Sequence, residues 1–203
     1  MSKLSNQLIG IRENKMIKLE TLEKIIKEID YTNIQLEIAW QIELIIKLRE
    51  KLGIDYQVIP EESLGQKGKC IKKEIDISIK KNNEPLCAIE LKMPRNKAYP
   101  RRMSEAIKDI VFLEGLLEKH DYKQGFFIFL TDNRGFWEGK ERDNIYKYFR
   151  DAEKISGKIP LPKFIKDKNK YYNISKSYTI HWQDDLPNIK GNWKYFIIEI
   201  KNN

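Results

Sequence analysis

The segment from residue 71 to residue 92 constrains the fold most, because its pattern predicts two neighbouring strands and a turn. Every second residue from 75 to 79 is isoleucine, as in a strand with one apolar face. Residues 86–92 form the second predicted strand, after the turn sequence Asn-Asn-Glu-Pro at 82–85. The segment therefore predicts a hairpin within a sheet.

The elements around this hairpin predict an α/β (α+β) core, in which a mixed central sheet is flanked by helices. Apolar residues recur at helical spacing in the segments 16–30, 33–52, 101–120 and 143–155. Other strands are expected at 55–59, 125–131, 178–182 and 195–200, and loops at 61–69 and 158–170. The segment 125–131 is apolar throughout, as is typical of a strand that is buried on both faces.

Some residues should mark where these elements end. Thr32 or Asn33 is expected to cap the second helix, and Gly53 to end it. Pro60 is expected to stop the strand that begins at residue 55.

The length of 203 residues suggests a single domain, 1–203, with a sizeable core. No apolar run approaches the roughly twenty residues of a membrane-spanning helix, so no membrane partner is expected. The N-terminus lacks the apolar segment of a signal peptide, and we expect a cytoplasmic location. Neither Cys70 and Cys87 nor His120 and His181 have the spacing of a disulfide framework or a zinc site.

The chain is basic, with 38 Lys and Arg against 30 Asp and Glu, a net charge of +8. This excess favours a polyanionic partner, and nucleic acid before a membrane surface. Charge alone is a weak signal, because many charged runs are only solvated surface.

The predicted hairpin places two acids opposite each other. Asp76 interrupts the isoleucine alternation, and Glu90 and Lys92 are two residues apart and so share one face. Asp76 and Glu90 are each seven residues from Asn83, so a hairpin folded about Asn83 opposes them directly. Two opposed carboxylates are destabilising without a cation, and carboxylate oxygens suit Mg²⁺, for which Mn²⁺ can substitute.

A further acid is expected from the helix at 33–52. On a helical wheel centred on Ile38, with Ile42 close to it, Glu37 falls between Leu44 and Leu48 on an apolar flank. A carboxylate in such surroundings is costly unless it is paired, which makes Glu37 a candidate functional acid. Glu43 instead falls on the solvent face.

The same residues also fit an exposed, solvated ion-pair surface. The tripeptide Glu-x-Lys is common and recurs in this chain at Glu199-Ile200-Lys201. That copy lacks a hairpin partner carboxylate, so the set Asp76, Glu90 and Lys92 is the stronger candidate.

At these positions the sequence resembles the PD-(D/E)XK nuclease superfamily, which includes many restriction endonucleases. The family core is a helix, three strands, a helix and a strand. Asp76 matches the acid of its second strand, Glu90 and Lys92 match its acid-x-Lys, and Glu37 matches the glutamate of its first helix. Ile75 stands where the family motif has proline.

The resemblance covers about residues 33–131, a restriction endonuclease-like core. It implies a Mg²⁺-dependent endodeoxyribonuclease that acts on double-stranded DNA, foremost a type II restriction endonuclease. Asp76 and Glu90 would hold the metal, Glu37 a second metal or a bridging water, and Lys92 would contact the nucleophile or the phosphate. Residues 132–203 would elaborate this core with recognition contacts or the contacts of a homodimer.

The expected DNA contacts lie in two loops. In residues 94–102 they are the cations Arg95, Lys97, Arg101 and Arg102, which would neutralise phosphates. After the strand at 125–131 they are Asn133 and Arg134, residue types that can read base edges. An ordinary loop is an equally good interpretation of this second segment.

Two other functions remain open. One is a recombination, repair or mobile-element nuclease with the same fold. The other is a non-catalytic DNA-binding protein, which the intact Asp, Glu and Lys set disfavours.

Overall fold

A five-stranded sheet forms the centre of the computed structural model, which describes residues 16–65, 74–162, 171–187 and 189–202. Its strands, in spatial order, are β1 (Tyr56–Ser63), β2 (Glu74–Lys81), β3 (Glu84–Lys92), β4 (Gln124–Thr131) and β7 (Lys194–Lys201). The pair β3–β4 is parallel and the other three pairs are antiparallel. The mixed sheet that the sequence predicted is therefore confirmed.

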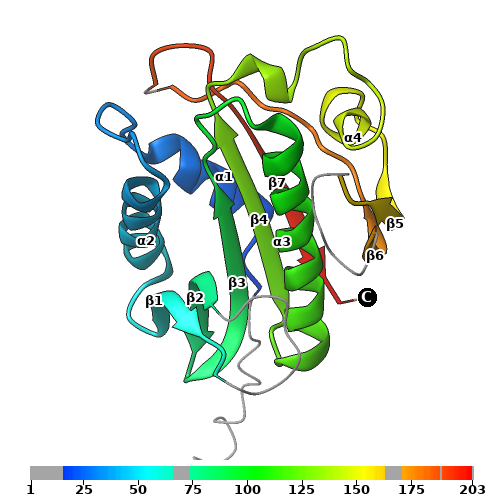
Figure 1. The fold of residues 1–203 in the computed structure, drawn as a ribbon. Coiled ribbons are helices and arrows are strands. Elements are labelled where there is room, and N and C mark those ends of the chain that lie inside the picture. The colour runs from blue at the N-terminus through cyan, green and yellow to red at the C-terminus, as the bar shows by residue number, and fades with distance from the viewer. Residues whose placement is uncertain (1–15, 66–73, 163–170, 188, 203) are drawn as a thin grey trace, which may run out of the picture.

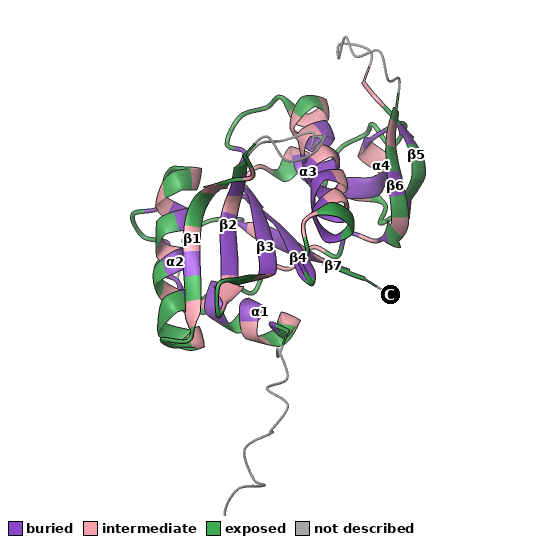
Figure 2. Cartoon of the chain, turned by 90° about the horizontal axis from the view of Figure 1, so that it is seen from below, coloured by how far each residue is buried: buried purple, intermediate pink, exposed green. Residues whose placement is uncertain are grey.

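Helices cover both faces of this sheet. Helices α1 (Leu19–Glu28) and α2 (Glu37–Leu52) lie on one face, and α3 (Tyr99–Lys119) lies on the other (Figures 1 and 2). Two apolar cores result, one on each face. Every residue of β4 is buried, with Phe127 and Phe129 in the α3 core and Phe126 and Ile128 in the opposite core. This explains why the segment is apolar throughout.

The turn between β2 and β3 consists of Asn82 and Asn83, whose φ angles are 54° and 64°. Asparagine tolerates this left-handed conformation better than most residues, and it suits a tight hairpin turn. The register begins at Lys81 opposite Glu84 and shifts by one residue between Ile79 and Lys80. The shift brings Ile77 opposite Ile89, and so places Asp76 across from Glu90.

The structure corrects two of the predicted boundaries. Helix α2 begins at Glu37 after Leu36, so neither Thr32 nor Asn33 is its cap. Strand β1 continues through Pro60 to Ser63, although Pro60 was expected to end it. Proline is tolerated there because β1 is an edge strand, where one row of N–H groups needs no partner strand. Gly53 follows α2 with a φ of 81°, as its predicted role requires.

The C-terminal third differs most from expectation. The predicted helix at 143–155 is only α4 (Tyr146–Arg150), and β5 (Ile155–Pro160) begins at the end of that predicted helix and continues into the loop expected at 158–170. Strand β5 pairs with β6 (Tyr171–Tyr178), so the strand predicted at 178–182 was wrong. Glu114 of α3 holds β6 in place, because its carboxylate accepts hydrogen bonds from two backbone N–H groups and a tyrosine hydroxyl of that strand.

The remaining expectations concern the cysteines, the histidines and membrane-spanning helices. Residues 61–63 of the loop predicted at 61–69 belong to β1 instead, and residues 66–69 and Cys70 lie outside the described residues, whereas Cys87 is buried as a free thiol. His120 directly follows the last residue of α3. Among the described residues, no helix is both long and apolar enough to cross a membrane.

Helix α2 exposes an apolar face. Ile38, Ile42 and Ile46 are 52%, 51% and 42% exposed, while the core side is formed by Trp40, Gln41, Leu44, Ile45 and Leu48. The apolar side centred on Ile38 and Ile42 is therefore not the side that packs on the core. Apolar residues lie all around this helix, so their periodicity does not single out the buried side.

This difference predicts that two truncations in α2 lower the free energy of unfolding by very different amounts. Leu44→Ala should lower the free energy of unfolding by about 2–5 kcal/mol, because it opens a cavity in the core. Ile42→Ala should change it by less than about 0.5 kcal/mol, because half of that side chain is already exposed. Urea denaturation of both variants measures the difference, and equal losses would show that Ile42 is covered in solution.

Candidate active site at the ends of β2 and β3

The candidate site lies where the backbone ladder between β2 and β3 ends. Beyond the pair of Ile77 and Ile89, carboxylates take over the bonding between the two strands. The Asp76 N–H donates to Glu90 Oε1 at 3.2 Å, and the Leu91 N–H donates to Asp76 Oδ2 at 2.8 Å. Both acids are thus fixed by the opposite strand, and Glu90 is fully buried.

Helix α2 contributes the third acid. Glu37, its first residue, accepts a hydrogen bond from the Met93 N–H just after β3. One turn later, the Gln41 side-chain amide donates to the Asp76 carbonyl oxygen at 2.6 Å and to Glu61 Oε1 at 2.8 Å. Burial raises the pKa of the Glu37 carboxyl group, although the Lys92 ammonium and the Met93 N–H counteract this. The start of α2 is therefore tied to both strands of the hairpin.

Lys92 lies in the same cluster, but it is not a solvated strand residue. Its Nζ atom is 2.9 Å from Asp109 Oδ2 on α3, and the two side chains are only 18% and 8% exposed. Burial lowers the pKa of Lys92, but Asp109, Glu37 and Asp76 together outweigh that effect and raise it. The surrounding carboxylates therefore keep the Lys92 side chain protonated.

Sequence reasoning missed Asp109. Its signal was present, because Asp109 lies three residues after Ala106 and four before Leu113, on the buried side of α3. An acid at such a position is costly unless it has a partner, and Lys92 supplies one.

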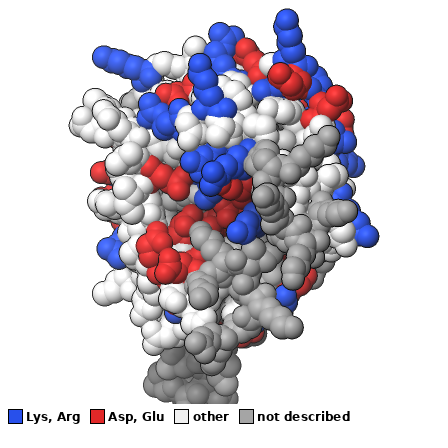
Figure 3. Space-filling view, in the orientation of Figure 1, with Lys and Arg blue, Asp and Glu red and all other residues white. Residues whose placement is uncertain are grey.

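A cleft of about 650 Å³ opens over this cluster. Glu37, Lys92 and Asp109 contribute to its wall, together with the cations Arg95, Arg102 and Lys108. In the space-filling view, acidic side chains gather near the centre of one face, with basic side chains above and beside them (Figure 3). The cleft thus combines groups that can attract a cation with groups that can attract a phosphate.

The donor chemistry of the cluster fits a hard divalent cation. Asp76, Glu90 and Glu37 each accept a backbone hydrogen bond through a carboxylate oxygen, and carboxylate oxygens are the ligands that such a cation prefers. As placed here, no three His, Cys, Asp or Glu side chains of the described residues converge into a ready-made metal site. Ligation would therefore require these carboxylates to move closer together.

The cations expected to bind DNA are mostly engaged in ion pairs. Arg95 lies 2.9 Å from Asp132, and Arg134 lies 2.7 Å from Glu138. Arg101 and Arg102 both contact Glu105, and they belong to the first turn of α3 because that helix begins at Tyr99. Lys97 is exposed in the loop before α3. These pairs reduce the positive charge that the cleft presents in the absence of a ligand.

The two loops that were expected to contact DNA lie side by side. The Thr131 hydroxyl donates to the Pro94 carbonyl oxygen at 2.7 Å, and the Tyr99 hydroxyl donates to Asn133 Oδ1 at 2.8 Å. The Asn133 side chain thus holds the loops together. Gly135 is needed here, because a Cβ atom on it would come within 2.2 Å of the Tyr99 ring.

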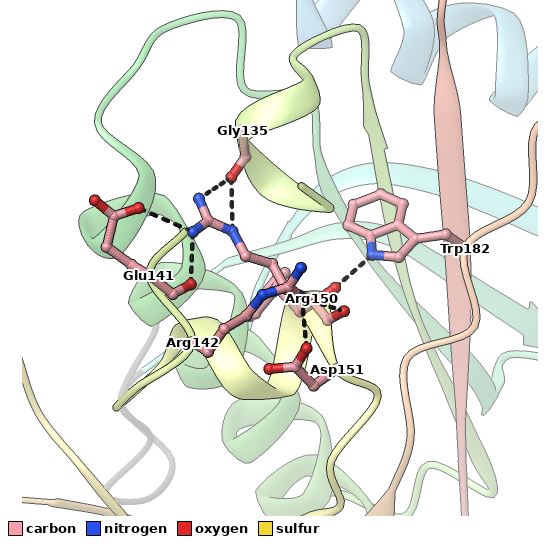
Figure 4. A network of polar contacts seen from close by, with 7 residues as sticks. Gly135, Glu141, Arg142, Arg150, Asp151 and Trp182 are labelled. Atoms are coloured by element: carbon pink, nitrogen blue, oxygen red, sulfur yellow. Dashed lines mark hydrogen bonds and ion pairs between the residues drawn. The ribbon is translucent and has the colours of Figure 1, made fainter. Parts of the chain in front are cut away.

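An arginine from α4 fixes the second loop (Figure 4). Arg150 donates to the carbonyl oxygens of Gly135 and Glu141, and Trp182 Nε1 donates to the Phe149 carbonyl oxygen. The guanidinium side chain of Arg150 is 2% exposed, so this network is a rigid support beside the cleft.

The second Glu-x-Lys tripeptide lies elsewhere. Lys201 pairs with Glu199 on β7 at 2.9 Å and lies opposite Gln124, at the start of β4. Lys92 instead lies opposite Phe129, near the end of β4. The two lysines therefore belong to different ends of the sheet.

No protein-family model, no curated protein and no solved structure matches the chain.

Proposed function

We propose that the chain is a Mg²⁺-dependent endodeoxyribonuclease of the PD-(D/E)XK type, foremost a type II restriction endonuclease. The observation that carries this proposal is the meeting of Glu37, Asp76, Glu90 and Lys92, from one helix and two strands, beside one cleft. An exposed ion-pair surface does not account for it, because Glu90 is fully buried and Lys92 is largely so.

In the proposed reaction, Asp76, Glu90 and Glu37 would hold Mg²⁺. The metal would stabilise charge on the phosphate and lower the pKa of a bound water. The Lys92 ammonium would stabilise the negative charge that grows on the phosphate oxygens as water attacks. Asp109 would hold that ammonium toward the cleft.

The surrounding cations would bind the DNA backbone. Arg95, Arg101, Arg102 and Arg134 would exchange their present carboxylate partners for phosphates, with which arginine forms the same forked hydrogen bonds. Lys97 would add a further charge, and Asn133 would position the two loops that carry these groups.

A digest of mixed DNA substrates tests this proposal. Duplex DNA should be cut in Mg²⁺ and remain intact in EDTA. Discrete fragments from plasmid DNA would support a restriction endonuclease, whereas cleavage of branched DNA alone would favour a recombination or repair nuclease. DNA binding without any cleavage would refute the catalytic proposal in favour of a non-catalytic DNA-binding protein.

Metal binding provides a separate prediction. Asp76→Asn should abolish the binding of Mg²⁺ or Mn²⁺ measured by titration calorimetry, because an amide removes the charge on which a divalent cation depends. The amide oxygen can still accept the Leu91 N–H, so the variant should fold. Asp55→Asn, at an exposed position between α2 and β1, is the matched control. Unchanged metal binding by Asp76→Asn would count against this site.

A further inference from the structure

A second cavity, of about 1160 Å³, adjoins the cleft that contains Lys92. Gln35 and Arg95 line both spaces. The other walls come from the loop between α1 and α2 and from the segment before β7, which lie at the upper end of the molecule in Figure 1. The two spaces therefore form neighbouring compartments, with Arg95 and Gln35 at their border.

The lining of the second cavity does not suit a phosphate. Its cations Arg95 and Lys190 are balanced in number by the carboxylates of Asp30 and Asp132. An anion would therefore gain little net attraction there. The neighbouring cleft differs, because its cations Lys92, Arg95, Arg102 and Lys108 outnumber its acids Glu37, Glu105 and Asp109.

The lining does suit a planar, polar ring. Tyr31 and Trp193 are largely buried beneath its wall, and the Arg95 guanidinium lies over the Trp193 ring at 4.8 Å from its centroid, with its side chain 42% exposed. Proteins hold unpaired bases on such aromatic and guanidinium planes. The exposed side chains of Asp30 and Gln35 provide hydrogen-bonding groups for the edge of a base.

The size of the cavity narrows the ligand further. Sites for small molecules usually measure about 300–1,000 Å³, so this space, of about 1160 Å³, is large enough for one or two nucleotides. A base enters such a space only after it leaves the helical stack, and an already unpaired base does so at the lowest cost.

We infer that this cavity binds an unpaired nucleobase of the DNA strand whose phosphate lies in the neighbouring cleft. The inference rests on the proposed nuclease function. It narrows the substrate class to DNA that presents an unpaired or extruded nucleotide beside the cleaved bond.

Two labelled duplexes that differ by one base test this inference. Both contain a single bulged nucleotide, which carries its base in one duplex and is abasic in the other. In EDTA, which prevents cleavage, the bulged base should bind about tenfold more tightly than the abasic bulge, within the range measured for stacking of one base. Fluorescence anisotropy gives both affinities, and a fully paired duplex provides the reference.

A surface variant should weaken this preference. Asp30 lines the second cavity and not the cleft, and Asp30→Asn should lower the affinity ratio of base to abasic bulge, because it replaces a carboxylate at the edge of the base with an amide. The side chain is exposed, and an asparagine at position 30 can still accept the Thr32 N–H, so folding should be retained. Gln57→Ala, on β1 and outside both cavities, should keep the tenfold ratio.

The outcomes separate this inference from the proposed function. Equal affinity for the two bulged duplexes, or a ratio that is the same in Asp30→Asn as in the wild type, would overturn the inference while cleavage in Mg²⁺ still supported the nuclease. Failure to bind or cut any DNA would instead refute the proposed function, and the inference with it.

Discussion

Lys92→Ala should lower the rate of DNA cleavage in Mg²⁺ by about 100- to 1,000-fold. Loss of a group that stabilises transition-state charge commonly costs about 2.7–4 kcal/mol of activation free energy. The Lys92 ammonium lies in the cleft and its charge interacts with Glu37 and Asp76. An exposed ion-pair lysine would contribute less than about 1 kcal/mol, so the two interpretations differ by orders of magnitude in rate.

Single-turnover cleavage, normalised to the folded fraction from circular dichroism, measures this effect. The normalisation is needed because Lys92→Ala leaves the Asp109 carboxylate buried without its closest cation. Lys201→Ala is the matched control, since Lys201 lies in the other Glu-x-Lys tripeptide and is 47% exposed. Normal cleavage by Lys92→Ala together with loss of activity in Lys201→Ala would move the site to β7.

The hairpin at the centre of the site could be predicted from the sequence, because the residues that determine it are neighbours in the chain. The isoleucine alternation defines β2, and the Asn82-Asn83 turn determines where the chain reverses. Counting from Asn83 placed Asp76 opposite Glu90, where the structure has them. The structure reaches that register by a two-residue turn and a bulge, which the count did not foresee.

Other features depend on contacts that local patterns do not contain. Pro60 predicts the end of a strand unless β1 is known to be an edge strand. The buried side of α2 was misread, because Ile42 and Leu44 are equally apolar and only the position of the sheet distinguishes them. Strand β6 is held by Glu114, about sixty residues earlier in the chain, and its own sequence is largely polar.

The pairing of Lys92 with Asp109 also depends on contacts between elements that are distant in the sequence. Asp109 breaks the apolar pattern of α3, whereas Lys92 shares a strand face with Glu90, and only the packing of α3 on the sheet brings the two charges together. The local patterns therefore do not identify either residue as the partner of the other.

Asp109→Ala should lower the free energy of unfolding by about 3 kcal/mol. Removing one partner of a buried ion pair usually costs about 3–5 kcal/mol, because the other charge stays buried without compensation. The lower end of this energy range is expected here, since Glu37 and Asp76 still interact with the Lys92 charge. Glu28→Ala is the control and should cost less than about 1 kcal/mol, because its partner Lys24 is 65% exposed and 4.0 Å away.

The double variant Lys92→Met/Asp109→Leu separates the cost of a lone buried charge from the value of the pair. It removes both charges and keeps similar side-chain volume, so it should recover most of the stability that Asp109→Ala loses. Urea denaturation of the wild type, Lys92→Met, Asp109→Leu and the double variant completes the cycle. A double variant as unstable as Asp109→Ala would mean that the pair itself stabilises the fold. Recovery of stability without recovery of cleavage would mean that the Lys92 ammonium is needed for catalysis and not for folding.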